Sequence, residues 1–207
     1  MLGGECVVLS GADGSGKTTT ARLLASYLSL HSPTRTHWFR GSHLLASAIA
    51  KLLSQFSSFR GFCNPYYGIC IPRKLRWLWI HIEFWSLLPH ALVRSLLRRF
   101  YRFLVCDRGF LDFIVWVVTT LNYPSFPSST YSRFLLRLAH REGPLYLYAD
   151  LEVLSRRADV PREFIARELA VYSVLARYIA RHSIDTGKYG PAEVVAEVLR
   201  CLEKQKQ

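Results

Sequence analysis

The chain is short of acidic residues and of long apolar runs. Among its 207 residues, 15 are aspartate or glutamate and 27 are lysine or arginine, so the formal net charge is +12. The most apolar window, 75–93, is interrupted by Arg76, His81, Glu83 and Pro89, which predicts a buried helix instead of a membrane span. The first residues also lack the basic segment that opens a secretory signal, so we expect no export.

Cysteine is scarce as well. The five cysteines are odd in number and follow no metal-ligand spacing, and the seven histidines form no ligand pattern. Cys6 and Cys106 lie in apolar segments typical of strands, where a thiol packs as a small hydrophobic group. Cys63 and Cys70 flank an expected turn, where a metal site is disfavoured because two further ligands are missing. These features predict reduced thiols and a cytoplasmic protein.

The excess of positive charge suggests a polyanionic partner, such as nucleotides, nucleic acid or a membrane surface. The basic residues do not form one tail but are spread over several helical segments, and most fit solvated helix faces. Arginine is much commoner than lysine among them. This preference suits bidentate binding of phosphate without proving it.

A complete phosphate-binding loop follows the first apolar segment. Residues 11–18, GADGSGKT, fit the pattern G-x-x-x-x-G-K-[ST], with a predicted strand before it and a helix after it. Glycines let backbone N–H groups surround phosphate oxygens, and the dipole of the following helix adds positive potential. We expect Lys17 to reach the β- and γ-phosphates of ATP and the Thr18 hydroxyl to ligate Mg²⁺. The expected cofactor-binding residues are Gly11, Ala12, Asp13, Gly14, Ser15, Gly16, Lys17, Thr18 and Thr19.

Apolar segments alternate with helical patterns along the whole chain. The predicted strands are apolar throughout, which is typical of a parallel sheet buried on both faces. We therefore predict an α/β fold, a P-loop NTPase-type three-layer sandwich with a five-stranded parallel sheet, as a single domain over 1–207. Segments 57–72 and 122–129 are predicted to be irregular. Strands are predicted over 5–10, 35–39, 102–106, 144–149 and 183–185, and helices over 17–30, 42–56, 73–97, 110–121, 130–141, 151–157, 162–181 and 192–203.

A second candidate site follows the predicted strand 102–106. Asp107 and Arg108 stand at its end, where P-loop proteins keep an acid for Mg²⁺. Asp107 is expected to hold the ion through water, and Arg108 to hold a phosphate group. An acid in this position can instead cap the next helix. The complete phosphate loop earlier in the chain favours the metal-binding role.

These residues resemble the thymidylate kinase family of P-loop nucleoside monophosphate kinases. The loop 11–19, with its internal aspartate, is similar to that family's phosphate loop, and Asp107-Arg108 is similar to its Asp-Arg pair after the third strand. The resemblance implies that Asp13 binds the 3′-hydroxyl of the acceptor sugar, and that Arg108 and Arg40 bind the acceptor phosphate. It implies Mg²⁺ at Asp107 and ATP-dependent phosphorylation of a deoxynucleoside monophosphate, foremost dTMP to dTDP.

The resemblance also implies a lid. Gly14 carries no side chain, so no arginine within the loop can reach the transferring phosphate, and family members of this type supply one from a lid. Here the break between two predicted helices places such a lid near 156–162. The candidate catalytic residues are Lys17, Arg108, Arg156, Arg157 and Arg162.

The sequence departs from the family where the base is read. The Glu-Pro-Gly-Gly run after the second strand is absent, and segment 92–101 looks expanded. Candidates for contacting the base lie on 73–88, although aromatic residues at helical spacing more often form a core. The acceptor base therefore stays open. These candidates are Arg73, Arg76, Trp79, Phe84 and Trp85, with Arg76 as the substrate-binding choice.

Three alternatives stay open. A deoxynucleoside or other small-molecule kinase on the same fold would need a carboxylate base, which Asp13, Asp107 or Asp112 could supply. A basic nucleic-acid-binding P-loop ATPase would bind in a salt-sensitive way, but no nucleic-acid module is recognisable, so this partner is disfavoured. A nucleotide-binding protein without catalysis is the third. Homodimer formation is left open, and no membrane partner is expected.

Overall fold

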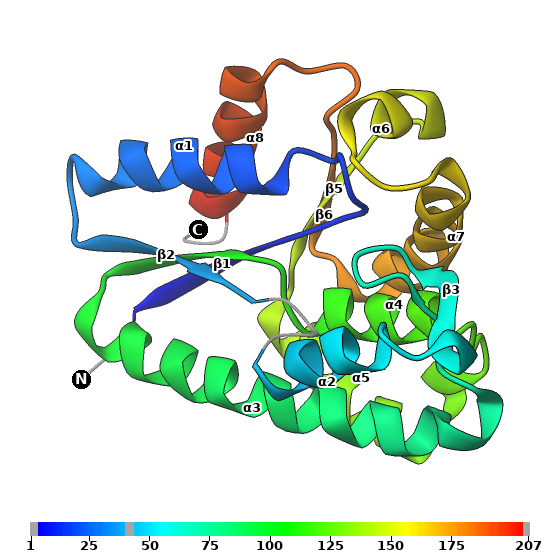
Figure 1. The fold of residues 1–207 in the computed structure, drawn as a ribbon. Helices are drawn as coiled ribbons and strands as arrows, with labels where there is room; N and C mark the ends of the chain where they lie inside the picture. The colour runs from blue at the N-terminus through cyan, green and yellow to red at the C-terminus, as the bar shows by residue number, and fades with distance from the viewer. Residues whose placement is uncertain (1–3, 40–43, 205–207) are drawn as a thin grey trace.

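A computed structural model describes residues 4–39 and 44–204 and shows one twisted sheet between two helical layers (Figure 1). All neighbouring strands are parallel, in the order β2-β4-β1-β5-β6. The predicted α/β fold with a five-stranded parallel sheet is thereby confirmed, and no end of the five predicted strands is displaced by more than one residue. The strands are β1 (Glu5–Ser10), β2 (Thr34–Trp38), β4 (Phe103–Asp107), β5 (Leu145–Tyr148) and β6 (His182–Asp185).

Each face of the sheet is covered by helices. α1 (Lys17–Ser29) and α8 (Pro191–Glu203) cover one face, where Leu24 and Val198 pack with Val105 of the sheet. The opposite face carries α3 (Arg76–Phe100), α4 (Phe110–Thr120), α5 (Thr130–Glu142) and α7 (Arg162–Ile179) (Figure 1). α4 is buried almost all round and lies at the centre of this layer, as expected for a helix that is apolar on every side.

The pairing of β1 with β4 brings the two candidate segments of the sequence together. Leu9 lies opposite Asp107, so the end of β4 stands beside the start of the loop that leaves β1. Both ends belong to the carboxyl edge of a parallel sheet, where ligands of such folds bind. The sequence candidates on 11–18 and at 107–108 therefore meet at one edge.

Segment 57–72 is more regular than predicted. It contains β3 (Arg60–Asn64), which forms antiparallel bridges to Ile69 in a small hairpin. Cys63 and Cys70 lie across this hairpin with a Cα–Cα distance of 4.9 Å and form a disulfide. The prediction of reduced thiols is therefore wrong for this pair, because the hairpin brings together two residues that the sequence only placed on either side of a turn.

Helix bounds changed mainly at their ends. Of the predicted helix 42–56, α2 covers Leu45–Leu53. Residues 44 and 54–56 are not helical, and residues 42 and 43 lie outside the described residues. α3 starts three residues later than predicted, after a 3₁₀ turn at Arg73–Leu75, and continues through Pro89 to Phe100. α6 (Leu151–Arg157) agrees with its prediction.

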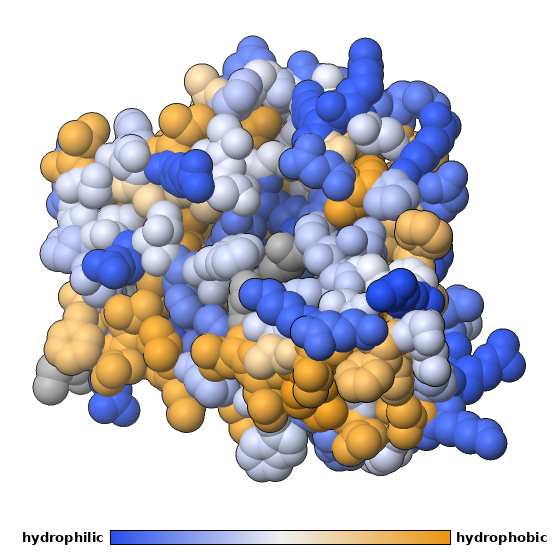
Figure 2. Space-filling model, viewed as in Figure 1, coloured by the Kyte–Doolittle hydropathy of each residue, from blue (hydrophilic) through white to orange (hydrophobic). Residues whose placement is uncertain are grey.

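The outer surface of α3 is apolar. Trp85 is 61% exposed and Leu92 is 69% exposed, and Leu96 lies one turn further along. Figure 2 shows apolar side chains gathered along the lower edge of the molecule, where α3 runs in Figure 1. Despite this, none of the helices in 4–39 and 44–204 is both long enough and apolar enough to cross a bilayer.

Candidate active site

The phosphate loop owes its shape to three glycines with positive φ. Gly11, Gly14 and Gly16 have φ of 155°, 81° and 80°. A Cβ on Gly11 would come within 2.2 Å of the Leu147 carbonyl oxygen, whereas a Cβ on Gly16 would meet nothing within 4 Å. The loop is thus packed tightly on the side of the sheet and open at the start of α1. This opening lies at a helix N-terminus, where the backbone favours an anion.

Lys17 is held inside this loop. Its Nζ donates to the Ala12 carbonyl oxygen at 2.7 Å and to Ser15 Oγ at 3.2 Å, and the side chain is only 4% exposed. Burial lowers the pKa of Lys17, and the nearby Arg108 guanidinium lowers it further. A buried ammonium beside a second cation is stabilised by a negatively charged ligand, which the open loop can receive.

Thr18 and Asp107 meet across the strand ends. The Thr18 hydroxyl donates to Asp107 Oδ2 at 2.5 Å, while the buried Oδ1 of Asp107 has no hydrogen-bond partner among the described residues. Carboxylate and hydroxyl oxygens are ligands that Mg²⁺ prefers. Within 4–39 and 44–204, no three His, Cys, Asp or Glu side chains gather as a metal cluster. A metal at this pair would complete its shell with phosphate and water, as is usual for Mg²⁺.

Asp13 is clamped between two donors. Its Oδ1 forms an ion pair with Arg108 Nη2 at 2.5 Å, and its Oδ2 accepts a hydrogen bond from the Tyr66 hydroxyl. Burial would raise the pKa of Asp13, but Arg108, Lys17 and the Tyr66 hydrogen bond outweigh it and hold the pKa well below its usual range. Arg108 itself has φ of 78°, a strained conformation for a non-glycine residue. Such strain at this position is typical of functional sites.

The carboxylates of Glu168 and Asp112 hold the phosphate loop in place through hydrogen bonds. Glu168 on α7 accepts the Asp13 backbone N–H at 2.8 Å, and burial together with the Asp13 charge raises its pKa to about 7. Asp112 accepts hydrogen bonds from Ser10 Oγ at 2.5 Å and from Tyr172 Oη at 2.7 Å. It also accepts the backbone N–H groups of Gly11 and Gly109. Asp112 therefore ties the end of β1 to the start of α4, and its oxygens are occupied.

The three arginines expected to form a lid are placed differently. Arg157 donates to the Thr186 carbonyl oxygen at 3.1 Å and lines a cavity of about 360 Å³ together with the phosphate loop and Arg108. Arg162 forms an ion pair with Glu152 at the surface. Arg156 is exposed at the end of α6. Only Arg157 is brought to the loop in this conformation.

The remaining substrate candidates contribute less. Arg40 lies outside the described residues. Arg76 places its guanidinium 5.7 Å from the centre of the Tyr123 ring, and its buried Nε has no hydrogen-bond partner among the described residues. Trp79 is 4% exposed and donates to Glu83 at 3.0 Å, so it belongs to the core, whereas Trp85 faces solvent. Arg73 lies in the 3₁₀ turn before α3, and Phe84 packs among aromatic neighbours.

Sequence reasoning missed Tyr66, Glu168 and Arg94. Tyr66 comes from a segment expected to be irregular, and Glu168 and Arg94 look like ordinary charged helix residues until the fold buries them. Arg94 supports Arg108 from behind, donating from Nη2 to the Arg108 carbonyl oxygen at 2.9 Å and pairing with Glu142. The arginine content of α3 was the one sequence feature that pointed to a role for this helix, but it did not distinguish Arg94 from the other arginines.

The strand, glycine loop and helix, with Asp107 at the neighbouring strand end, define a P-loop α/β fold. No protein-family model and no curated protein sequence matches the chain. Solved structures do: a thymidylate kinase from Candida albicans has a TM-score of 0.68 and 16% identity, covering 99% of this chain and 93% of its own. A thymidylate kinase from Ehrlichia chaffeensis has a TM-score of 0.53 and 18% identity, covering 97% and 100%. The resemblance to thymidylate kinases is thus confirmed at the level of the fold.

Proposed function

We propose that the chain transfers the γ-phosphoryl group of ATP to a deoxynucleoside monophosphate, with dTMP as the preferred acceptor. The observation that carries this proposal is the Asp13–Arg108 ion pair at the edge of the phosphate loop. A carboxylate beside bound polyphosphate is unfavourable unless it meets a hydroxyl or a cation. Here one oxygen of Asp13 holds the arginine and the other accepts from a hydroxyl, which is the arrangement that a sugar hydroxyl beside a phosphate would require.

ATP fits the loop on the side of α1. Its β- and γ-phosphates would lie over the open N-terminus of α1, with Lys17 released from Ala12 and Ser15 to bind them. A second hollow of about 220 Å³ continues from Gly16 and Arg157 to Thr186 and Tyr189, in the direction available to the nucleoside. Thr18 and Asp107 would hold Mg²⁺, whose charge neutralises the transferring phosphate.

The residues of the chain act by position and charge. Transfer between phosphates requires alignment and electrostatic stabilisation more than proton removal. Arg108 would hold the acceptor phosphate, and Arg157 would stabilise the charge that develops during transfer. Arg157 already lines the same cavity as Lys17 and Arg108, so it needs little movement to do this.

A panel of acceptors tests the proposal. Purified protein is incubated with ATP and Mg²⁺ and with dTMP, the other deoxynucleoside monophosphates, their ribonucleotide counterparts or free thymidine. Products are separated by chromatography, and Lys17→Ala protein prepared in the same way controls for contaminating kinases. We expect dTDP from dTMP. Phosphorylation of thymidine but not dTMP would identify a nucleoside kinase, and ATP hydrolysis stimulated only by nucleic acid would identify an ATPase.

A further inference from the structure

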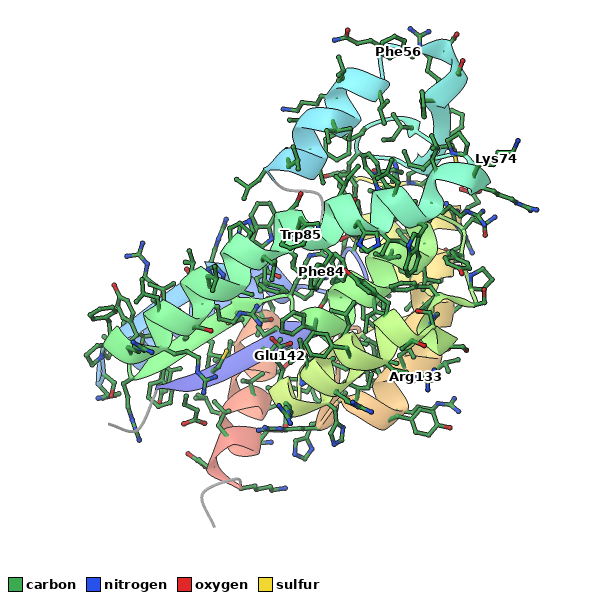
Figure 3. All side chains as sticks on the ribbon, turned by 90° about the horizontal axis from the view of Figure 1, so that it is seen from below. Phe56, Lys74, Phe84, Trp85, Arg133 and Glu142 are labelled. Carbon is green, nitrogen blue, oxygen red and sulfur yellow. A yellow bond between two sulfur atoms is a disulfide. The ribbon has the colours of Figure 1, made fainter. Side chains whose placement is uncertain are left out.

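A further cavity, separate from the two described above, lies between α3 and α5, close to the beginning of β1. Its volume is about 630 Å³, within the range of small-molecule sites, and none of its lining residues belongs to the phosphate loop. Figure 3, which views this side of the molecule, shows Glu142 between the ribbons of α3 and α5. Arg94, through its hydrogen bond to the Arg108 carbonyl oxygen, connects the cavity wall to the candidate active site.

The cavity wall carries a large excess of positive charge. Five arginines line it against two glutamates, and Glu142 is already paired with Arg94. Among the described residues, no carboxylate forms an ion pair with Arg98, Arg102 or Arg141. Like charges gathered around one hollow repel one another, and an anion in the hollow relieves that repulsion. The arginines are Arg94, Arg98, Arg102, Arg141 and Arg181.

Arg94 adds a buried donor to this wall. It is 6% exposed, and its Nε has no hydrogen-bond partner among the described residues. Buried polar groups in native proteins are normally hydrogen-bonded, so an unpaired donor in a cavity wall indicates a missing partner. Guanidinium groups bind phosphate oxygens through paired N–H donors.

We propose that this cavity is a second anion site that binds a small phosphorylated ligand. The arginines come from α3, the start of β4, the end of α5 and the start of β6, and they converge on one hollow instead of forming a stripe along the surface. Convergence on a hollow of this size favours a compact anion over an extended nucleic-acid strand. The proposal does not depend on the kinase assignment.

Cys6 provides a reporter inside the cavity. Its half-buried side chain lines the hollow, with Sγ 3.2 Å from the Sγ of Cys106. The hydrogen bond with Cys106 lowers the pKa of Cys6 against the effect of burial, and Arg94 and Arg98 lower it further. Cys6 should therefore react with iodoacetamide when the cavity is empty. Cys201 on α8 is also half-buried but lies outside the cavity, so it serves as an internal control.

The test uses inorganic pyrophosphate as the probe, with ionic strength held constant by sodium chloride. Alkylation rates at Cys6 and Cys201 are measured by peptide mass spectrometry, and radiolabelled pyrophosphate bound per chain is measured by equilibrium dialysis. The full chain is compared with Lys17→Ala, which disables the phosphate loop, and with the double variant Arg98→Gln/Arg141→Gln. Arg177→Gln, an exposed arginine of α7 outside the cavity, is the matched control.

We expect pyrophosphate to slow alkylation of Cys6 and not of Cys201, in the full chain, in Lys17→Ala and in Arg177→Gln. In Arg98→Gln/Arg141→Gln, half-protection should need about tenfold more pyrophosphate or more, because two charged hydrogen bonds are lost. That variant should also bind one pyrophosphate fewer per chain. Binding that Lys17→Ala abolishes and the double variant retains would overturn the proposal. Equal slowing at both cysteines, or protection by a short RNA but not by pyrophosphate, would also overturn it.

Discussion

Glu168 should make the stability of this protein depend on pH in a direction unusual for a glutamate. The side chain is 2% exposed, and its pKa is raised from 4.5 to about 7 by burial first and then by the charge of Asp13. Arg108 and Lys17 oppose the shift but do not cancel it. The folded protein therefore keeps a proton on Glu168 over a pH range in which the unfolded chain has already released it.

The sign and size of the pH effect on the free energy of unfolding follow from this difference in bound protons. Between pH 4.5 and pH 7 the folded state binds more protons than the unfolded state, so the free energy of unfolding falls as pH rises. The loss is at most about 1.4 kcal/mol per pH unit, or about 3 kcal/mol over the whole window. Above pH 7 the loss is complete and stability no longer depends on Glu168. His37, whose pKa is lowered from 6.5 to about 4 by burial first and then by Arg94, acts in the opposite direction between pH 4 and pH 6.5.

Glu168→Gln isolates this contribution. Glutamine resembles the protonated acid and keeps an oxygen to accept the Asp13 N–H, so the loop geometry is preserved. Unfolding by urea is measured from pH 5 to pH 8 for the wild type, for Glu168→Gln and for Glu163→Gln. Glu163 lies exposed on the same helix and is the matched control. His37 contributes equally to all three proteins, so only differences between the curves are interpreted.

We expect the stability of Glu168→Gln relative to wild type to increase by up to about 2.5 kcal/mol between pH 5 and pH 8. Glu163→Gln should stay parallel to wild type over the same range. Parallel curves for wild type and Glu168→Gln would show that Glu168 is ionised in the folded protein throughout, and the account of its burial beside Asp13 would be wrong.

Four further predictions address the active site and assembly. Lys17→Ala should lower phosphoryl transfer at least about a hundredfold with an unchanged thermal midpoint; product assays and calorimetry would measure this, and retained transfer would contradict it. Asp13→Asn should reduce acceptor turnover more than ATP affinity, and 3′-deoxy acceptors should be poor substrates of the wild type by about tenfold or more; equal use of both acceptors would remove Asp13 from this role. Tyr66→Phe should lower the KM for the acceptor by about fivefold and leave the KM for ATP unchanged, because it removes a competing donor; a higher acceptor KM would mean that Tyr66 binds the acceptor. The apolar face of α3 should form a homodimer, so wild type should sediment as a dimer and Leu92→Glu/Leu96→Glu as a monomer; two monomers would refute this.

The strands of the sheet could be predicted because the residue patterns that identify them lie within short stretches of sequence. The apolar strands and the glycine pattern of the loop are contiguous in sequence, and alternating strands and helices indicated a parallel sheet, whereas the strand order came only from the structure. The hairpin 60–70 could not be predicted, because its disulfide and its bridges depend on how the chain folds back over α4. Composition rich in glycine, proline and serine marks a departure from helix but does not give its shape.

The residues of the candidate site likewise fall into those that local sequence could place and those that it could not. Residues within one motif, such as Lys17 and Thr18, could be placed from their spacing. Asp107 and Arg108 could be placed from their position after a buried strand. Glu168 could not, because a charged residue on an amphipathic helix is buried only when a distant segment covers it, here the loop at Asp13 about 155 positions earlier. The role of Arg94 behind Arg108 could not be predicted either, because the sequence does not show that α3 packs against β4.

The two oxygens of Asp13 connect these distant elements to a mechanism. Arg108 holds one oxygen, so the carboxylate stays ionised and its orientation is fixed before any ligand binds. Tyr66 holds the other, and an acceptor hydroxyl would have to take its place. When one hydroxyl replaces another, the Asp13 oxygen keeps the same number of hydrogen bonds. The net free-energy cost of this exchange is therefore small compared with leaving a buried carboxylate unpaired. Tyr66 therefore supplies the hydrogen bond to Asp13 while no acceptor is bound. The hairpin that carries Tyr66 would have to move when the acceptor enters.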